Sequence, residues 1–148
     1  MNGIRSVVGC SVLALAAVTL GACSSDSGET VNVAAADFSL TPDVTSVPAG
    51  TVKFKVKNNG GFGHEMVVAK VADASDLPTK PNGEVDEDKI AKAAQLGEVE
   101  DVLPGQTKTL KLDLDAGKYV LFCNRVDGTT TIHFKKGMHA DFTVTPAK

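Results

Sequence analysis

Short stretches in which apolar and polar residues alternate dominate the chain from residue 31 onward. In the clearest of them, Val52, Phe54 and Val56 share one face of the stretch 51–57 and lysines occupy the other. An alternation with a period of two predicts a strand with one buried face and one face in water. Because turn-forming Gly, Pro, Asn and Asp residues separate the strand-like stretches, the pattern predicts an all-β sandwich or barrel. Further apolar or alternating runs lie at residues 31–38, 65–71, 106–114, 118–123 and 140–145.

One part of the chain departs from this pattern. Residues 72–104 have the character of an insertion between two strands, and they contain a stretch rich in Ala, Lys and Gln. Asp86 is suited to cap the start of a helix from Glu87 to Leu96, and Gly97 is suited to end it. We therefore predict one short helix in this insertion, with its charged face in water.

The first residues have the pattern of an export signal. A positively charged start precedes an apolar run at residues 7–20, which is shorter than the ~20 residues needed to cross a bilayer. The stretch Leu20–Cys23 resembles a bacterial lipobox, in which the Cys thiol receives a lipid; the alternative is ordinary export with an incidental Cys. We expect residues 1–22 to be a lipoprotein signal peptide and residues 23–30 to be a lipidated N-terminus and flexible tether. The protein would then be extracytoplasmic and anchored by lipid on Cys23 to a bacterial membrane.

Size and charge narrow the class of protein further. The remaining residues, 31–148, fit one domain, and a net charge of −3 is too weak to suggest a nucleic-acid partner. With 43% hydrophobic but only 5% aromatic residues, the core of this domain must be mostly aliphatic. We expect the domain to be a monomer.

If the signal peptide is removed and Cys23 is lipidated, only one of the three cysteines remains as a free thiol. Cys10 leaves with the signal peptide and Cys23 carries the lipid, so Cys123 remains alone in a compartment where thiols tend to be oxidised. Without a partner in its own chain, Cys123 is a liability, a dimer-forming handle, a nucleophile or a metal ligand. The other candidate ligands in the sequence indicate which of these roles Cys123 has.

Four side chains that can bind soft or borderline metals lie at predicted strand ends or in loops: His64, Cys123, His133 and Met138. Taken singly, each has an alternative role without metal: a His can be a surface residue, a Met can be part of the core, and a Cys can be a buried inert thiol. A tetrahedral zinc site is built from Cys and His without a thioether, whereas two imidazoles, a thiolate and a weak thioether suit copper that changes oxidation state. Taken together, the four residues predict one mononuclear copper ion.

The stretches 63–68, 119–124 and 133–138, which contain these residues, carry a resemblance to a known family. Together with the earlier stretch 47–54, they resemble the cupredoxins, the blue type 1 copper proteins such as plastocyanin and azurin. The resemblance implies a Greek-key β-sandwich with a type 1 copper ion at one end. It also implies that one His is an isolated ligand and that a Cys, a His and a Met come from the loop between the last two strands.

The second His departs from the family pattern. Residues 124–132 separate Cys123 from His133, where the cupredoxins generally keep only a few residues. An Asp-Gly pair in this stretch predicts a two-residue hairpin turn, which would bring His133 back toward Cys123. The competing ligand is His139, but as the neighbour of Met138 on a strand it is expected to point to the opposite side.

Three neighbours of the ligands are expected to support the site. Asn124 can brace the ligand loop through hydrogen bonds, and Glu65 can do the same beside His64. The alternative for Glu65 is a solvated charge. Gly63 lets the backbone approach the metal closely, and its carbonyl could be a distant fifth contact.

The resemblance implies that the protein carries single electrons, with the edge of His133 as the point of exchange, framed by Phe62 and Phe134. Its partner would be a redox protein such as a cytochrome or an oxidase. The alternative is a copper carrier, buffer or copper-resistance lipoprotein that delivers copper to a copper-accepting protein. An enzyme is not expected, because one mononuclear set lacks the additional copper ions of oxidases and no hydrolytic arrangement stands out.

Overall fold

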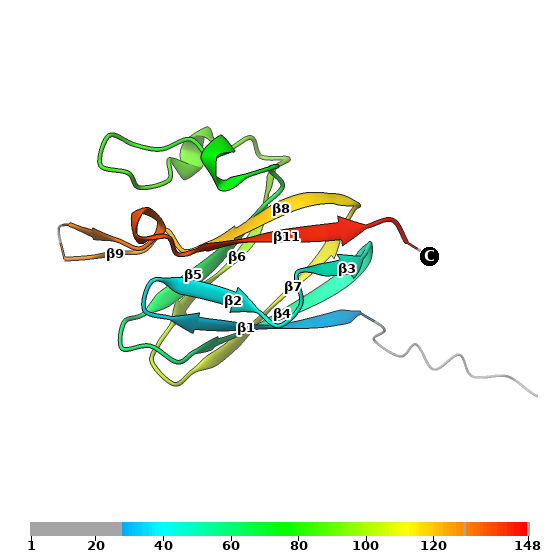
Figure 1. The fold of residues 1–148 in the computed structure, drawn as a ribbon, viewed down its shortest axis with the longest axis horizontal. Coiled ribbons are helices and arrows are strands. Elements are labelled where there is room, and N and C mark those ends of the chain that lie inside the picture. The colour runs from blue at the N-terminus through cyan, green and yellow to red at the C-terminus, as the bar shows by residue number, and fades with distance from the viewer. Residues whose placement is uncertain (1–27, 129, 148) are drawn as a thin grey trace, which may run out of the picture.

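The computed structural model describes residues 28–128 and 130–147, which form two packed β-sheets and a smaller layer of loops (Figure 1). The predicted signal peptide and the lipidation site Cys23 lie outside these residues. In the described part of the chain, no helix is long and apolar enough to cross a membrane. The elements in chain order are β1 (Glu29–Ala36), β2 (Ser39–Pro42), β3 (Ser46–Pro48), β4 (Gly50–Asn58), β5 (His64–Ala69), η1 (Ala74–Asp76), η2 (Glu87–Lys89), β6 (Gln95–Val102), β7 (Thr107–Leu114), β8 (Gly117–Phe122), β9 (Val126–Asp127), β10 (Thr131–Ile132), η3 (Phe134–Lys136) and β11 (His139–Thr145).

The strand order confirms the predicted all-β sandwich. One sheet has the order β2-β1-β4-β7, the other has the order β3-β11-β8-β5-β6, and β9 and β10 form a separate two-stranded hairpin. Two pairs are parallel, β1 with β4 and β3 with β11, and the remaining named pairs are antiparallel. Strand β1 begins at Glu29, two residues before the expected start of the domain.

The apolar face predicted for residues 51–57 forms part of the contact between the two sheets. In β4, Val52, Phe54 and Val56 have no exposed surface, and the lysines between them face outward. The ring of Phe54 meets Phe142 of β11, in the other sheet, edge to face with 5.4 Å between centroids. Burying aliphatic and aromatic side chains from both sheets in one layer is the main source of stability in such a sandwich.

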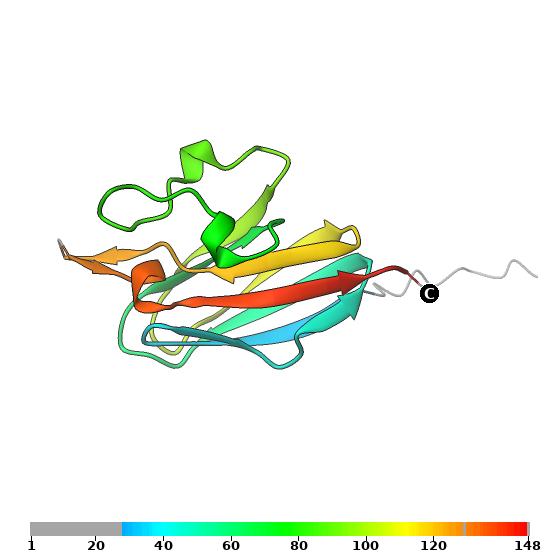
Figure 2. The same ribbon diagram turned by 45° about the horizontal axis from the view of Figure 1, so that its top comes forward.

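Strands β5 and β8 of the second sheet are buried on both faces. Residues of β5 and β8 that point away from the sandwich core, including Val67, Val120 and Phe122, pack under Val85 and Ile90 of the inserted segment. Figure 2 shows this segment as a green layer lying against the sheet. The continuous apolar run at residues 65–71 therefore belongs to a strand covered on both sides.

The helix predicted from Glu87 to Leu96 is wrong. Only residues 87–89 form a single 3₁₀ turn; Asp86 makes no capping hydrogen bond, and its carboxylate pairs with Lys89 at 2.7 Å. Residues 95–102 instead form β6, which pairs with the free edge of β5. Helix propensity is a weak preference, and here pairing with an otherwise unpaired strand and burial of Val99 and Val102 outweigh it.

One end of the sandwich gathers the candidate ligands. His64 is the first residue of β5, Cys123 directly follows β8, and η3 begins after His133 and ends just before Met138. In Figure 1 these positions lie at the left end, with the β9–β10 hairpin, whereas β1 begins and β11 ends at the right. The fold thus separates the metal-binding end from the end where the described chain begins.

Candidate metal centre

His64, Cys123 and His133 converge in a buried cluster. One possible ligand atom from each residue lies within 4.8 Å of the others, and none of the three side chains has exposed surface. The two Nδ1 atoms are 3.3 Å apart, and the Sγ of Cys123 is 3.5 Å from Nδ1 of His133. Two donor atoms bound to one ion at about 2.0–2.3 Å are separated by roughly 3.3–3.8 Å, so these separations fit a shared metal ion.

Met138 lies beside this cluster. It is fully buried and belongs to the same packed group of side chains as Cys123. Its carbonyl accepts a 3.0 Å hydrogen bond from the backbone N–H of Cys123, and its own N–H donates to the carbonyl of His133 at 3.1 Å. Two imidazoles, a thiol and a thioether form a donor set that suits copper and not zinc.

The competing imidazole lies on the other side. His139 is exposed at the start of β11, and its ring packs against Phe134 with 5.5 Å between centroids. Met138 is buried and the next residue, His139, is exposed. This agrees with the expectation that His139 points away from the metal position.

A hairpin brings His133 to Cys123 despite the long spacing. Strands β9 and β10 pair in antiparallel register, and the N–H of His133 donates a 3.0 Å hydrogen bond to the carbonyl of Arg125. The expected two-residue turn is wrong, because Asp127 pairs with Thr131 and the connection is therefore longer. Gly128, with a φ of 62°, supplies the left-handed backbone that favours glycine after β9.

Each imidazole has a carboxylate near its outer nitrogen, and neither carboxylate was among the predicted site residues. Asp127 Oδ2 lies 2.7 Å from Nε2 of His133. Asp37 Oδ1 lies 3.6 Å from Nε2 of His64, and this buried nitrogen has no hydrogen-bond partner. Asp127 could have been predicted as a neighbour of the site, because it is an acidic residue in the stretch between Cys123 and His133. Asp37 could not, because it lies in a turn far away in the sequence.

Glu65 and Asn124 connect the two strands that carry ligands. The backbone N–H of Glu65 lies 3.5 Å from the sulfur of Cys123, and its carboxylate accepts a 2.9 Å hydrogen bond from the N–H of Asn124. The side chain of Asn124 exchanges two hydrogen bonds with the backbone of Val85 and donates a third to Glu87. Glu65 is therefore engaged in the site and is not a solvated charge.

Burial controls the protonation of the cluster. It raises the pKa of the Cys123 thiol to about 11, so in the metal-free protein the thiol keeps its proton and metal binding has to release it. Burial, together with the charge of His133, lowers the pKa of His64 and favours the neutral imidazole that a metal requires. Burial and the nearby carboxylate of Glu87 raise the pKa of Glu65 to about 7.

Gly63 leaves room for a side chain of the ligand loop. A Cβ atom at this position would lie 3.1 Å from the guanidinium carbon of Arg125, which is tighter than an ordinary contact. The guanidinium also pairs with Asp101 at 3.1 Å and approaches Asp127 at 3.5 Å. The role of the Gly63 carbonyl as a distant metal contact stays a prediction.

Two aromatic rings cover His133, but they are not the predicted pair. The rings of Phe38 and Phe62 lie edge-on to its imidazole, with centroids 5.3 and 6.1 Å away. Phe134 packs instead against Phe122, on the side of the inserted segment, so its predicted place beside the edge of His133 is wrong. Phe62 is 41% exposed, whereas His133 has no exposed surface.

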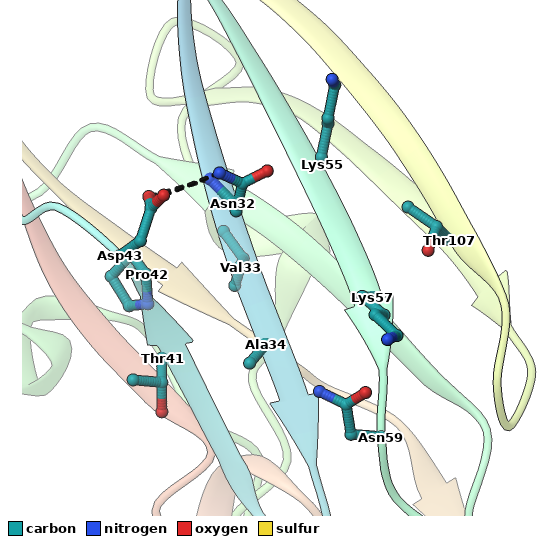
Figure 3. Close-up of a pocket in the computed structure, with 10 residues that line it drawn as sticks. All are labelled: Asn32, Val33, Ala34, Thr41, Pro42, Asp43, Lys55, Lys57, Asn59 and Thr107. Atoms are coloured by element: carbon teal, nitrogen blue, oxygen red, sulfur yellow. Dashed lines mark hydrogen bonds between the residues drawn. The ribbon is translucent and has the colours of Figure 1, made fainter.

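A surface groove on the described part of the chain lies apart from this cluster. It has a volume of about 480 Å³ and follows the outward face of the β2-β1-β4-β7 sheet, and Asn32, Lys55 and Lys57 are among the residues that line it (Figure 3). None of the four candidate ligands lines it. The groove is therefore not the metal centre.

Comparisons with known proteins agree with this description. The family model of the cupredoxin-like domain matches residues 9–132, which include His64 and Cys123 and end just before His133. No curated protein matches this sequence. The combination of the family match with the donor set establishes that His64, Cys123, His133 and Met138 form a type 1 copper site.

Solved structures of blue copper proteins have the same fold. A reduced auracyanin from Roseiflexus castenholzii has a TM-score of 0.60 and 20% identity, over 80% of this chain and 98% of its own. An azurin from Methylomonas sp. strain J has a TM-score of 0.56 and 18% identity, over 78% of this chain and 97% of its own. A reduced rusticyanin has a TM-score of 0.50 and 23% identity, over 80% of this chain and 81% of its own.

Proposed function

Since this chain belongs to the cupredoxin-like family, we propose that it carries single electrons between redox partners outside the cytoplasm. Bound copper supplies the chemistry by alternating between Cu(I) and Cu(II). The chain itself holds the ligands in place, keeps water away from them and provides a route for the electron. No substrate is transformed, so the protein is not an enzyme in this proposal.

The observation that carries the proposal is the complete burial of the four ligands. His64, Cys123, His133 and Met138 have no exposed surface. An electron can cross a thin layer of protein, but a copper-accepting protein has to bring its own ligands to the metal. Burial therefore favours electron transfer over the alternative of copper delivery.

The surroundings of the ligands support rapid exchange between oxidation states. Hydrogen bonds from the backbone of Glu65 to the sulfur and from Cys123 to Met138 fix the ligand positions from two sides. Close-packed interiors resist movement, so little rearrangement accompanies the change of charge. This is the property that an electron carrier needs.

The exposed ring of Phe62 marks the entry route that we propose for the electron. Phe62 is 41% exposed and contacts His133, which is itself covered. Val126, which is also exposed, precedes Asp127 in β9, on the hairpin that holds His133. An apolar surface of this kind suits brief docking of a redox protein such as a cytochrome or an oxidase.

The proposed membrane anchor is compatible with this route. A lipid on Cys23 would hold the chain from the end where β1 begins, and the metal centre lies at the opposite end (Figure 1). A protein tethered in this way can turn its copper end toward partners. The anchoring and the signal peptide at residues 1–22 remain part of the proposal.

The proposal is tested on a copper-loaded soluble form, residues 24–148, which lacks the signal peptide and the lipidation site Cys23. We expect an intense visible band from thiolate-to-copper charge transfer, a type 1 electron paramagnetic resonance spectrum and reversible one-electron cycling. A copper-loaded protein without this band, or one that cannot be cycled, contradicts the proposal. Release of the copper to a chelator faster than electron exchange with a redox partner favours the delivery function instead.

A further inference from the structure

The β9–β10 hairpin places a carboxylate against the outer edge of one copper-binding imidazole. Asp127 Oδ2 lies 2.7 Å from His133 Nε2, and the imidazole is wholly buried while the Asp127 side chain is 25% exposed. We propose that Asp127 is a positioning residue, which fixes the orientation of His133 and stabilises the oxidised copper ion through its negative charge. The inference rests on the proposed electron-carrier function and assigns a residue outside the ligand set.

The two nitrogens of His133 have different neighbours, and these define its tautomer. Nδ1 faces the metal position, 3.3 Å from Nδ1 of His64 and 3.5 Å from the sulfur of Cys123. Nε2 faces the carboxylate of Asp127. A neutral imidazole carries one proton, so Nε2–H donates to Asp127 and the lone pair of Nδ1 is left for the metal. The contact at Nε2 thus prevents the ring from turning its wrong nitrogen inward.

The carboxylate is itself held in place. Asp127 is paired with Thr131 across the hairpin, and its second oxygen lies 3.5 Å from Nε of Arg125. Arg125 is fixed by a 3.1 Å ion pair with Asp101 and by the backbone hydrogen bond from His133 to its carbonyl. The inserted hairpin therefore presents a fixed negative charge to His133.

The other imidazole lacks such support. Asp37 lies 3.6 Å from Nε2 of His64, and that nitrogen makes no hydrogen bond. Asp37 Oδ1 instead accepts a hydrogen bond from the backbone N–H of Gly61. Of the two carboxylates near the site, Asp127 makes the closer contact with a ligand, at 2.7 Å against 3.6 Å for Asp37.

A negative charge next to a ligating imidazole acts on the reduction potential. A carboxylate that accepts a hydrogen bond from a ligating imidazole makes that imidazole a stronger donor, and losing such a partner typically costs 10–100-fold in metal affinity. The charge attracts Cu(II) more strongly than Cu(I), so it lowers the potential. Arg125 offsets part of the charge, and we therefore expect an effect near the lower limit, about tenfold.

The main test replaces the charge and keeps the shape. In copper-loaded Asp127→Asn, we expect the affinity for Cu(II) relative to Cu(I) to fall about tenfold, which raises the reduction potential by about 59 mV. The matched control is Asp101→Asn, which removes the other carboxylate partner of Arg125 without touching His133. We expect its potential to equal that of the wild type. An unchanged potential in Asp127→Asn, or an equal rise in both variants, overturns the inference.

A second test needs no copper. In the metal-free wild type, nitrogen chemical shifts of His133 should place the proton on Nε2, and Asp127→Ala should lose this preference while Asp37→Ala keeps it. A wild-type proton on Nδ1, or a tautomer that does not respond to Asp127→Ala, overturns the role of Asp127. Because this readout is independent of copper, it separates a failure of the inference from a failure of the proposed function.

Discussion

The two halves of the copper site are held by different kinds of structure. The strand half consists of His64 and Cys123, which lie at the ends of the neighbouring antiparallel strands β5 and β8. The loop half consists of His133 and Met138, which flank η3 between the hairpin and β11. Hydrogen bonds of the sheet fix the strand half, whereas the loop half depends on a hairpin and on its own side-chain contacts.

This difference separates what the fold supplies from what this chain adds. Any sandwich that pairs β5 with β8 brings His64 near Cys123. The inserted hairpin, with its own carboxylate, gives His133 a charged partner. The strand half should therefore control whether copper binds, and the loop half should control the properties of the bound copper.

The largest expected effect comes from breaking the strand half at Cys123. In Cys123→Ser the thiolate is absent, so the charge-transfer band should disappear. The loss of copper affinity should exceed the roughly 10–100-fold that follows removal of an outer hydrogen-bond partner. Visible spectroscopy and calorimetric titration with copper measure both effects. A retained band would mean that another group supplies the sulfur ligand.

The next largest effect comes from breaking the loop half at His133. We expect His133→Ala to lose the type 1 spectrum, because the imidazole that faces Cys123 at 3.5 Å is removed. His139→Ala is the matched control, since that ring is exposed and lies against Phe134. It should leave the electron paramagnetic resonance spectrum unchanged. The opposite result, with only His139→Ala altered, would mean that the loop half is assembled differently.

Sequence reasoning reached the strand half more completely than the loop half. The apolar run that follows His64 and the apolar run that ends at Cys123 are local signals, and the structure forms a strand at each of them. That His133 lies near Cys123 was also predictable, because an Asp-Gly pair indicates a hairpin. Its length was not, because the register of the hairpin depends on pairing between Asp127 and Thr131.

The errors have a common physical origin in contacts between distant parts of the chain. The helix predicted from Glu87 to Leu96 is absent, and its last two residues belong to β6, because pairing with the edge of β5 outweighs the local preference. Because Phe134 follows His133 in the sequence, we predicted that it lies at the edge of the copper site. In the structure it begins the 3₁₀ turn η3, and its ring packs against Phe122. Phe38 and Asp37 reach the site from a turn far away in sequence, and no local pattern could show this.

The smallest expected effect on the copper site comes from Asn124, where a substitution should change the stability of the fold but not copper binding. In Asn124→Ala, the buried N–H and carbonyl of Val85 lose their partners, which should cost about 2–4 kcal/mol in the free energy of unfolding. The backbone N–H of Asn124 still donates to Glu65, so the type 1 spectrum should persist. Asn82→Ala is the control, because its side chain is exposed and bonds only to Glu84.

Urea unfolding of the metal-free proteins measures the difference. We expect Asn82→Ala to stay within about 0.5 kcal/mol of the wild type, as surface substitutions usually do. If Asn124→Ala unfolds as late as this control, the inserted segment is held by its apolar contacts with Val120 and Phe122 alone. If it unfolds earlier and also loses the type 1 spectrum, the strand half depends on the inserted segment and not only on sheet hydrogen bonds. Early unfolding with an intact spectrum is the result that places the ligand geometry of the strand half in the sheet itself.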